Sequence, residues 1–295
     1  MQYEDYNSVN NLHQFKESFY VVLDSRNATG SENSVPSYNS NMYWDLKEPI
    51  VLEKNFYRLT CNLCSFVAPN SFYQINYTNN IFYFTMNSTI YNIQVAYGNY
   101  NANTFITQLL SQLPVGFSMS ININNNLFTL SHTTYNFVID SNKSTIGSVM
   151  GFSSNNLATL TKIVSPSTIS STLFTLTFPY TCNFAGLQSL NVSFEDINTK
   201  NIDSLNLCNS SIICAIPVDC EVGGLIAFQS RNEYEFTIKQ RVLDYIQISL
   251  KDDLGNYIDL NNQHFNCVLQ FNLYGEDTKQ KYEFHDIINN PYPQI

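Results

Sequence analysis

The sequence predicts a mainly β protein, a β-sandwich or jelly roll that is interrupted by a small α+β module. Three observations support this. About nine short apolar or alternating segments are separated by Asn, Gly, Pro and Asp turns. Charged residues nearly vanish from Ser71 to Phe194, where 3 of 124 residues are charged, against 35 of the other 171. One segment of this charge-poor stretch has helical periodicity.

The composition limits the possible classes of protein. The chain has 295 residues, of which 44% are hydrophobic and only 13% charged, and it contains 40 Asn. The apolar fraction excludes wholesale disorder. The net charge of −10 disfavours binding to nucleic-acid phosphates. No apolar run reaches the roughly 18 residues of a membrane span, and Met1–Asp5 has no signal-peptide character, so we expect no membrane span and no secretion signal.

The segments outside the charge-poor stretch, and its last part, have the period of strands. Tyr57–Val67 alternates, with Tyr57, Leu59, Cys61 and Leu63 on one face. The alternation is clearest in Phe265–Leu273, which places apolar residues on one face and Asn266, Gln270 and Asn272 on the other. Shorter strand-like segments are Phe19–Asp24, Leu173–Phe178, Leu187–Phe194, Ile212–Val218, Leu225–Phe228, Tyr234–Ile238 and Leu243–Leu250.

The charge-poor stretch begins with a different pattern. Asn101 or Asn103 can cap a helix over residues 103–113, which has apolar residues at positions i, i+3, i+4 and i+7 and ends before Pro114. The strands expected around it are Ile81–Thr85 and Ile90–Val95 with a turn at Asn87-Ser88, Phe117–Ile123 and Leu127–Ser131 with a turn at Asn124–Asn126, and Tyr135–Ile139.

An abrupt fall in charge, followed by a return to ordinary composition, is typical of a module embedded within another domain. We therefore divide the chain into a first part of the sandwich with an N-terminal arm (1–70), an insertion domain with one helix (71–161), a second part of the sandwich (162–275) and a C-terminal tail (276–295).

The cysteines could have indicated a metal site. Their number is odd, at seven, and without a signal peptide we expect free thiols in a reducing compartment. Cys61 and Cys64 have the spacing of a zinc knuckle, yet residues three apart on a strand point to opposite faces. Cys208, Cys214 and Cys220 are six apart but have no matching second pair. Buried apolar thiols are the simpler interpretation.

No constellation of residues indicates catalysis. His13, His132, His264 and His285 occur in unrelated contexts, outside any known nucleophile or metal motif. The adjacent carboxylates Glu195-Asp196 are typical of a solvated loop. Asp252–Asn256 lacks the alternating ligands of a calcium loop and is predicted to be a turn between two strands. We therefore assign no catalytic, cofactor-binding or metal-binding residue and expect neither an enzyme nor a cofactor.

Several short stretches together carry a resemblance to a known family. They are Val22–Ser25, Leu63 with Ala68–Asn76, Gly98-Asn99-Tyr100, the following helix, Met150-Gly151-Phe152, and a C-terminal set made of Ile246 to Asp252, Gly255, Ile258-Asp259 and Asn261-Asn262 to Phe265. In this combination, which covers most of residues 18–275, the chain resembles minor capsid and penton proteins of virophages and related large DNA viruses. Its Asn-, Ile- and Tyr-rich composition is typical of the AT-rich genomes that such viruses often have.

The resemblance implies a single jelly roll whose strands are split by an insertion domain. Such a protein assembles as a pentamer that closes the fivefold vertices of an icosahedral shell, in contact with a larger major capsid protein. The expected location is the virion, after assembly in the host cytoplasm. Two tandem β domains, as in non-vertex minor capsid proteins, fit the same strand pattern. Isolated aromatics in Met1–Glu17 and Glu276–Ile295 suggest arms that order on neighbouring subunits, and tails without a role are the alternative.

Two other functions stay open. A β-rich insertion could bind host glycans or a receptor, with Trp44 and the Tyr-rich segment Tyr73–Tyr100 as contacts, although core packing explains most of these aromatics equally simply. A β-sandwich hydrolase would need two converging carboxylates, and the insertion holds only Asp140.

Overall fold

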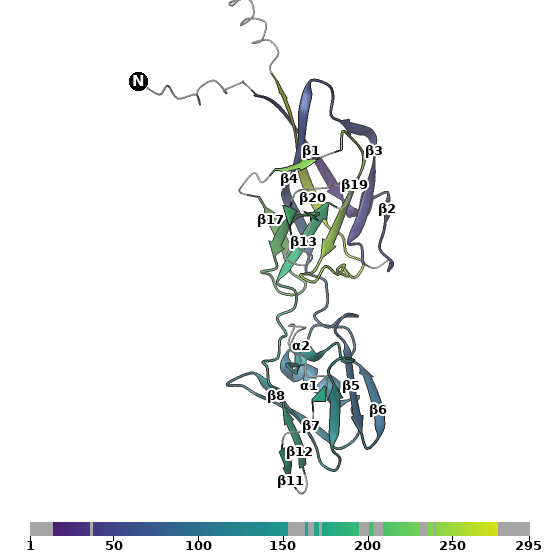
Figure 1. Cartoon of the computed structure of the whole chain (residues 1–295), viewed down its shortest axis with the longest axis vertical. Coiled ribbons are helices and arrows are strands. Elements are labelled where there is room, and N and C mark those ends of the chain that lie inside the picture. The colour runs from purple at the N-terminus through teal and green to yellow at the C-terminus, as the bar shows by residue number, and fades with distance from the viewer. Residues whose placement is uncertain are drawn as a thin grey trace, which may run out of the picture. The chain divides into compact units, whose positions relative to one another are not determined.

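The computed structural model describes residues 14–35, 38–152, 163–164, 168–170, 173–194, 201–202, 209–230, 235–238 and 240–276. The chain forms two compact units (Figure 1). Unit 1 combines Met1–Phe72 with Ser189–Ile295, and unit 2 is Tyr73–Gln188. Both are built almost entirely of antiparallel strands, so the prediction of a mainly β protein is confirmed.

Unit 1 consists of two sheets. The first, sheet one, has the order β1-β20-β4-β17, with β18 also paired to β4. Its strands are β1 (Gln14–Asp24), β20 (Asn266–Glu276), β4 (Phe56–Pro69), β17 (Leu225–Gln229) and β18 (Phe236–Ile238). The second, sheet two, has the order β16-β13-β19-β3-β2. Its strands are β16 (Ile212–Pro217), β13 (Ser189–Phe194), β19 (Val242–Lys251), β3 (Asn41–Val51) and β2 (Gly30–Ser31). A 3-10 turn (Ser25–Asn27) and the short pair β14 (Asn201–Ile202) and β15 (Asn209–Ser210) complete the unit.

The strand order of unit 1 is that of a jelly roll. Along the chain β1, β4, β17 and β20 enter sheet one, whereas β3, β13, β16 and β19 enter sheet two. Counting β17 and β18 as two pieces of one position, these are the eight strands of a jelly roll. Unit 2 interrupts it between β4 and β13, the third and fourth of these eight strands.

One of these strands, β3, is absent from the sequence-based prediction. Its first half, Asn41–Trp44, is mostly buried, but Asp45, Lys47, Glu48 and Pro49 follow and are exposed. A strand that is buried over only four residues has too short an alternation to be found from the sequence, and β19 supplies the pairing that makes it a strand.

The two sheets of unit 1 bury their inner faces against each other. Phe265, at the start of β20, lies 5.7 Å from the ring of Phe66 in sheet one and 6.2 Å from that of Trp44 in sheet two, measured between ring centroids. The Trp44 indole also donates a hydrogen bond to the Asp24 carbonyl, at 3.1 Å. All three aromatic side chains are buried, and each contributes about 1.5–3 kcal/mol of hydrophobic stabilisation. This contact identifies the unit as a sandwich.

The described residues of unit 2 form two four-stranded sheets and two helices. One sheet has the order β10-β9-β5-β6, with strands β5 (Ile81–Met86), β6 (Thr89–Gln94), β9 (Phe137–Asp140) and β10 (Ile163–Val164). The other has the order β11-β12-β8-β7, with strands β7 (Phe117–Asn122), β8 (Leu127–His132), β11 (Thr168–Ser170) and β12 (Leu173–Thr177). The helices are α1 (Ala102–Leu110) and α2 (Gly147–Met150).

Local sequence signals explain the start of unit 2. Asn87 and Ser88 both adopt positive φ, 48° and 61°, which is the two-residue turn that joins β5 to β6 as predicted. Asn101 caps α1, because its side chain accepts from the backbone of Thr104 while the Thr104 hydroxyl accepts from the Asn101 amide.

The helix is shorter than predicted and is not the only one in the unit. The regular helix ends at Leu110, three residues before the predicted end at 113, and Ser111 follows as its C-cap in the α conformation. Leu113 is still buried, and its amide donates to the Leu109 carbonyl at 3.2 Å. The four-residue helix α2 lies in a segment without helical periodicity.

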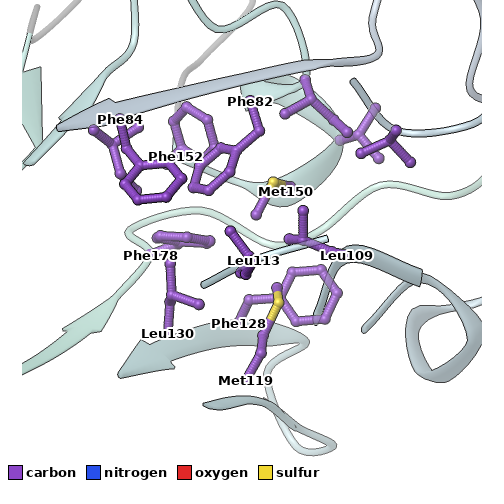
Figure 2. Close-up of a cluster of buried hydrophobic side chains, with 14 of the residues drawn as sticks. Phe82, Phe84, Leu109, Leu113, Met119, Phe128, Leu130, Met150, Phe152 and Phe178 are labelled. Atoms are coloured by element: carbon purple, nitrogen blue, oxygen red, sulfur yellow. The ribbon is translucent and has the colours of Figure 1, made fainter. Parts of the chain in front are cut away.

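The core of unit 2 is dominated by phenylalanine (Figure 2). Phe152 lies 5.9 Å from Phe82 of β5 and 5.2 Å from Phe178, measured between ring centroids. Phe128 of β8 packs on Phe105 of α1 at 6.0 Å. Both sheets and α1 therefore share one hydrophobic core.

The last strands of unit 2 lie beyond the predicted end of the insertion. Residues 173–177 form β12, which pairs with β8 from Phe174↔His132 to Thr177↔Thr129. Phe178 is buried in the core of unit 2 and its amide donates to the Phe128 carbonyl at 2.9 Å. The predicted boundary at residue 161 assigns these residues to the second part of the sandwich (162–275), so this boundary is wrong. Nothing in a short strand of Leu, Phe and Thr residues indicates which sheet it joins. In the structure this strand pairs with β8 of unit 2.

Candidate assembly surface

The outer face of sheet one is polar, whereas its inner face is apolar. Side chains alternate along each strand, so the even-numbered residues of β1 and β20 share the outer face. The register pairs Lys16 with Tyr274 and Ser18 with Asn272. On the neighbouring strand β4, Arg58 and Thr60 pair with Tyr274 and Asn272. The polar alternation predicted for Phe265–Leu273 is therefore confirmed.

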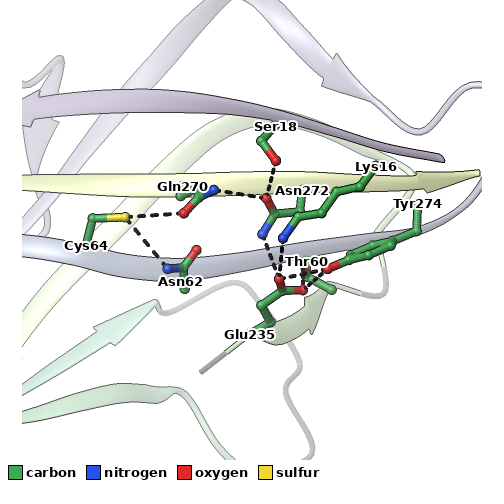
Figure 3. A network of polar contacts seen from close by, with 9 residues as sticks. All are labelled: Lys16, Ser18, Thr60, Asn62, Cys64, Glu235, Gln270, Asn272 and Tyr274. Carbon is green, nitrogen blue, oxygen red and sulfur yellow. Dashed lines mark hydrogen bonds and ion pairs between the residues drawn. The ribbon is translucent and has the colours of Figure 1, made fainter. Parts of the chain in front are cut away.

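Glu235, directly before β18, is the centre of a polar network on this face (Figure 3). Its carboxylate accepts hydrogen bonds from the Lys16 ammonium at 3.0 Å, the Thr60 hydroxyl at 2.7 Å, the Asn272 amide at 3.0 Å and the Tyr274 hydroxyl at 2.7 Å. One carboxylate thus connects the entry to β18 with three strands of the sheet.

The network continues along the face. The Asn272 carbonyl oxygen accepts from Ser18 Oγ at 2.7 Å and from Gln270 Nε2 at 3.2 Å. Gln270 in turn accepts from the Cys64 thiol, whose sulfur accepts from Asn62 Nδ2, both at 3.7 Å. Asn62 and Asn272 are 3% and 1% exposed. Buried amides need their hydrogen bonds, so the network fixes the side chains of this face.

These contacts and the burial of the network shift the pKa values of Glu235, Tyr274 and Lys16. Burial raises the pKa of Glu235, but the hydrogen bonds from Thr60, Tyr274 and Lys16 outweigh it and hold the pKa below its ordinary value. Burial, and after it the hydrogen bond to Glu235, raises the pKa of Tyr274. The hydrogen bond to Glu235 raises the pKa of Lys16. Each shift favours the charged Glu235–Lys16 pair beside a neutral phenol.

Arg58 adds a second cation to the same end of the sheet. Its guanidinium lies over the Tyr274 ring, 4.1 Å from the ring centroid, and the Lys16 ammonium lies 5.5 Å from the same centroid. Such cation–π contacts hold the aromatic ring flat on the sheet.

Strand β1 is an edge of sheet one and carries exposed apolar residues. In the described part of the chain its only strand partner is β20. The side chains of Tyr20 and Val22 are 63% and 72% exposed. An exposed edge with apolar side chains is a typical site for contact with another chain.

The cysteines lie in separate environments. Cys61 and Cys267 are buried on the inner side of sheet one, and burial raises the pKa of Cys267 to about 12 and that of Cys61 well above its usual range. Cys64 contacts the outer-face network, so it does not share a face with Cys61. The six described cysteines form no disulfide with one another, and Cys208 lies outside the described residues.

The other polar residues that were considered as candidate site residues form hydrogen bonds or ion pairs within the fold where they are described. His132 is buried, and its Nδ1 accepts from the Thr134 and Tyr135 amides at 3.0 and 2.8 Å. His264 Nδ1 contacts Ser25 Oγ at 3.2 Å. Asp140 forms an ion pair with Lys143 at 3.7 Å. His13, His285, Glu195 and Asp196 lie outside the described residues, as do the two arms except for Gln14–Glu17, which belong to β1, and Glu276, which ends β20.

The turn predicted at Asp252–Asn256 is confirmed. The Asp252 carboxylate accepts from the Leu254 and Asn256 amides at 2.9 and 2.8 Å, and Gly255 adopts φ +82°. Across the described residues no group of three or more His, Cys, Asp or Glu side chains is placed to hold a metal ion. In the same set, no helix is long and apolar enough to cross a membrane.

The aromatic residues considered for ligand binding divide into two groups. Trp44 is buried in the core of unit 1, and Tyr91 stacks on Phe84 at 4.9 Å in unit 2. Tyr73, Tyr77 and Tyr97 are 38%, 44% and 51% exposed. Core packing therefore accounts for the first group only.

Sequence reasoning missed Glu235, Tyr20 and Val22. The alternation of β20 pointed to its polar face, but nothing in the residues around Glu235 indicates that this acid reaches β1, β4 and β20. Tyr20 and Val22 belong to a run that was predicted as a strand, and only the sheet order shows that the strand is an edge.

Comparison with known proteins gives matches among solved structures. No protein-family model matches the chain, and no curated protein matches its sequence. A crystal structure of the mavirus penton protein is similar at a TM-score of 0.45 and 8% identity, covering 88% of this chain and 99% of that one. A chain of the Sputnik virophage, solved by cryo-EM, is similar at a TM-score of 0.39 and 13% identity, covering 90% of this chain and 99% of that one.

Proposed function

We propose that the protein is a non-enzymatic structural subunit of an icosahedral virus shell, and that it closes the fivefold vertices as a penton. The observation that carries this proposal is the topology of unit 1, one jelly roll interrupted between β4 and β13 by unit 2. The sequence resemblance implies this same architecture, and its short motifs are spread over both units.

The surface chemistry supports assembly. Unit 2 has a charge-poor sequence, with Asp140 and Lys143 paired to each other. Contacts made by neutral Asn, Ser, Thr and Tyr side chains bury few unpaired charges, which would be costly to desolvate. A cyclic assembly also needs two different patches on each subunit. Unit 1 supplies separate sheet edges, β1 in sheet one and β16 in sheet two.

Light scattering after size exclusion tests the oligomeric state. A pentamer of 33.8 kDa chains has a mass of about 169 kDa, and this is the expected result for the purified protein or for protein released from particles. Cryo-EM of the particles then tests the position. Density for unit 1 at the fivefold vertices supports the penton role, density elsewhere in the shell supports a non-vertex minor capsid protein, and absence from particles refutes both.

A second function, recognition of a host-surface glycan or receptor by unit 2, is favoured by the exposed side chains of Tyr73, Tyr77 and Tyr97. Exposed tyrosines in an Asn-rich segment suit contacts with sugars, since the ring stacks and the amides hydrogen-bond. A glycan array probed with the wild-type protein and a triple Tyr→Ala variant tests this function. Binding that the variant loses supports it, and absence of binding refutes it for glycans.

A further inference from the structure

The backbone of β1 presents unused hydrogen-bonding groups at the edge of sheet one. The Ser25 amide donates to the Phe265 carbonyl at 3.0 Å, so residues 25 and 265 form a hydrogen-bonded pair. The register between β1 and β20 runs without a shift from Gln14↔Glu276 to Asp24↔Asn266. In an antiparallel ladder such pairs alternate, so the odd-numbered residues of β1 bond to β20. The amides and carbonyls of Ser18, Tyr20 and Val22 therefore point away from the sheet.

This edge lacks the features that usually protect edge strands. Proline, bulges and charged side chains normally block pairing with another chain. The middle of β1, Ser18–Val22, contains none of these. Its outer face instead exposes Tyr20 and Val22, and the charged residues Lys16, Glu17 and Asp24 lie toward its two ends.

We propose that this edge binds the C-terminal segment of a second copy of the chain, as an added antiparallel strand formed by residues 280–286. Main-chain hydrogen bonds to Ser18, Tyr20 and Val22 would provide the pairing, as in other cases of strand addition.

The C-terminal segment has the length and pattern for this role. After Glu276, 19 residues follow, which span about 63 Å when extended, whereas the eleven residues of β1 span about 36 Å. Within the segment Tyr282 and Phe284 alternate with Glu283 and His285. This period of two is that of a strand with one apolar face.

The geometry favours a second copy over the chain's own segment. Glu276 pairs with Gln14, so the segment begins beside the start of β1. To reach the outer edge of its own β1 it would have to pass around the Gln14 end of that strand and then run parallel to it, and parallel pairing is slightly less stable per residue than antiparallel pairing. A segment from a second copy can enter at the Asp24 end and run antiparallel.

Charge complementarity selects one register. With Tyr282 opposite Tyr20, Asp286 lies opposite Lys16 and His285 lies opposite Glu17. Both pairs are favourable across a sheet, the second when the histidine is protonated. A shift by two residues, with Phe284 opposite Tyr20, places Ile288 opposite Lys16 and loses both pairs. Lys16 already contacts Glu235 at 3.0 Å, and its ammonium has three donors, so it can serve both carboxylates.

The test is a photo-crosslinking experiment on the full chain. Tyr282 is replaced by benzoylphenylalanine, and the variant is mixed with copies labelled with nitrogen-15. Mass spectrometry then identifies the linked peptides and shows whether they come from different copies. Cross-links from position 282 of one copy to Ser18–Val22 of the other are expected. Cross-links confined to one copy, or to another element, overturn the inference.

Matched variants at one position test the edge itself. Val22→Pro removes an amide donor that points away from β20, so the ladder within sheet one remains, and it should lower the intermolecular cross-link yield by about tenfold or more. Val22→Thr keeps the donor and the β-branched shape and should stay within about twofold of the wild type. An unchanged yield for Val22→Pro overturns the inference. If this variant melts early, Tyr20→Lys replaces it, because a lysine on the edge blocks pairing and leaves the backbone unchanged.

This inference rests on the proposed function only in requiring a second copy, and the two can fail separately. A 169 kDa particle without cross-links at β1 overturns strand addition and leaves the penton role intact. Cross-links at β1 in a protein that is absent from virus particles support strand addition and refute the capsid role.

Discussion

Replacing Glu235 by glutamine tests whether the outer-face network stabilises unit 1. In the wild type its carboxylate accepts from Lys16, Thr60, Asn272 and Tyr274, and its side chain is 17% exposed. Glutamine has nearly the same shape, but it removes the negative charge and replaces one oxygen by a donor. The variant therefore changes the electrostatics of the network and leaves its packing nearly unchanged.

The expected loss follows from the partners. A hydrogen bond to a charged group contributes about 1.5–3 kcal/mol, and a neutral one about 0.5–1.5 kcal/mol. Thr60, Asn272 and Tyr274 are buried, so each of their bonds to Glu235 weakens by up to about 1 kcal/mol. The pair with the part-exposed Lys16 adds little. Glu235→Gln should thus lower the free energy of unfolding by about 2 kcal/mol, or roughly 4–8 °C in Tm for a unit of this size.

The loss should depend on pH. The pKa of Glu235 lies below its ordinary value, so its contribution is fully present above the pKa of the unfolded chain, about 4.3, and disappears as the pH falls through the lower folded value. Wild type and variant should therefore differ at pH 7, and the difference should shrink as the pH falls below about 4.3.

Trp44 provides the assay. It is the single tryptophan of the chain and is buried in unit 1, so its fluorescence reports the unfolding of that unit. Urea unfolding of wild type and Glu235→Gln at several pH values gives the free energies. Glu48→Gln, at an exposed position of β3, is the matched control and should stay within about 0.5 kcal/mol of the wild type. Equal stability of Glu235→Gln and wild type at pH 7, or a difference that does not shrink as the pH falls below about 4.3, would refute the reasoning.

Three further predictions concern single positions. Gly151→Ala, at φ +84°, would bring a Cβ within 2.1 Å of the Tyr180 carbonyl oxygen, and it should unfold unit 2 or lower its free energy of unfolding by more than about 3 kcal/mol. Gly223→Ala is the control, since it has a similar φ of +82° but lies in open space, and in thermal melts it should lower the free energy of unfolding by only about 1–2 kcal/mol. His132→Phe leaves the Thr134 and Tyr135 amides without their acceptor, so it should speed their hydrogen exchange and lower the free energy of unfolding by about 2 kcal/mol. His132→Asn should restore part of this loss, and equal exchange rates in the two variants would contradict the role of Nδ1. The Cys267 thiol, with its pKa raised to about 12, should react with Ellman's reagent at pH 8 only as fast as unit 1 unfolds, and rapid labelling in the folded protein would show that the site is open.

Features that depend on a few neighbouring residues were predictable. The turn at Asn87-Ser88 needs positive φ at two positions, and the cap at Asn101 needs a short polar side chain before an apolar helical period, so the residues themselves carry both signals. The faces of β4 and β20 followed from an alternation sustained over many residues. Helix α2 and strand β3 escaped prediction because their apolar patterns are too short.

Features that depend on distant pairing were not predictable in the same way. The end of unit 2 is determined by β12, whose partner β8 lies more than forty residues earlier in the chain. Its alternating Leu, Phe and Thr residues suit either unit equally well. The charge-poor stretch, which continues to Phe194, was a closer guide to the end of this unit at Gln188 than the predicted boundary at residue 161.

By itself, the sequence determined the β class of this protein, the faces of its long strands, its tight turns and the beginning of its main helix, because each of these follows from side chains that are neighbours along the chain. Only the tertiary structure decided that the outer strands form one jelly roll, that β1 is an edge, and that Glu235 joins β1, β4 and β20. These properties arise where segments that are distant in the sequence come into contact, such as β1 with β20 and Lys16 with Glu235, and the sequence of one segment does not identify the other.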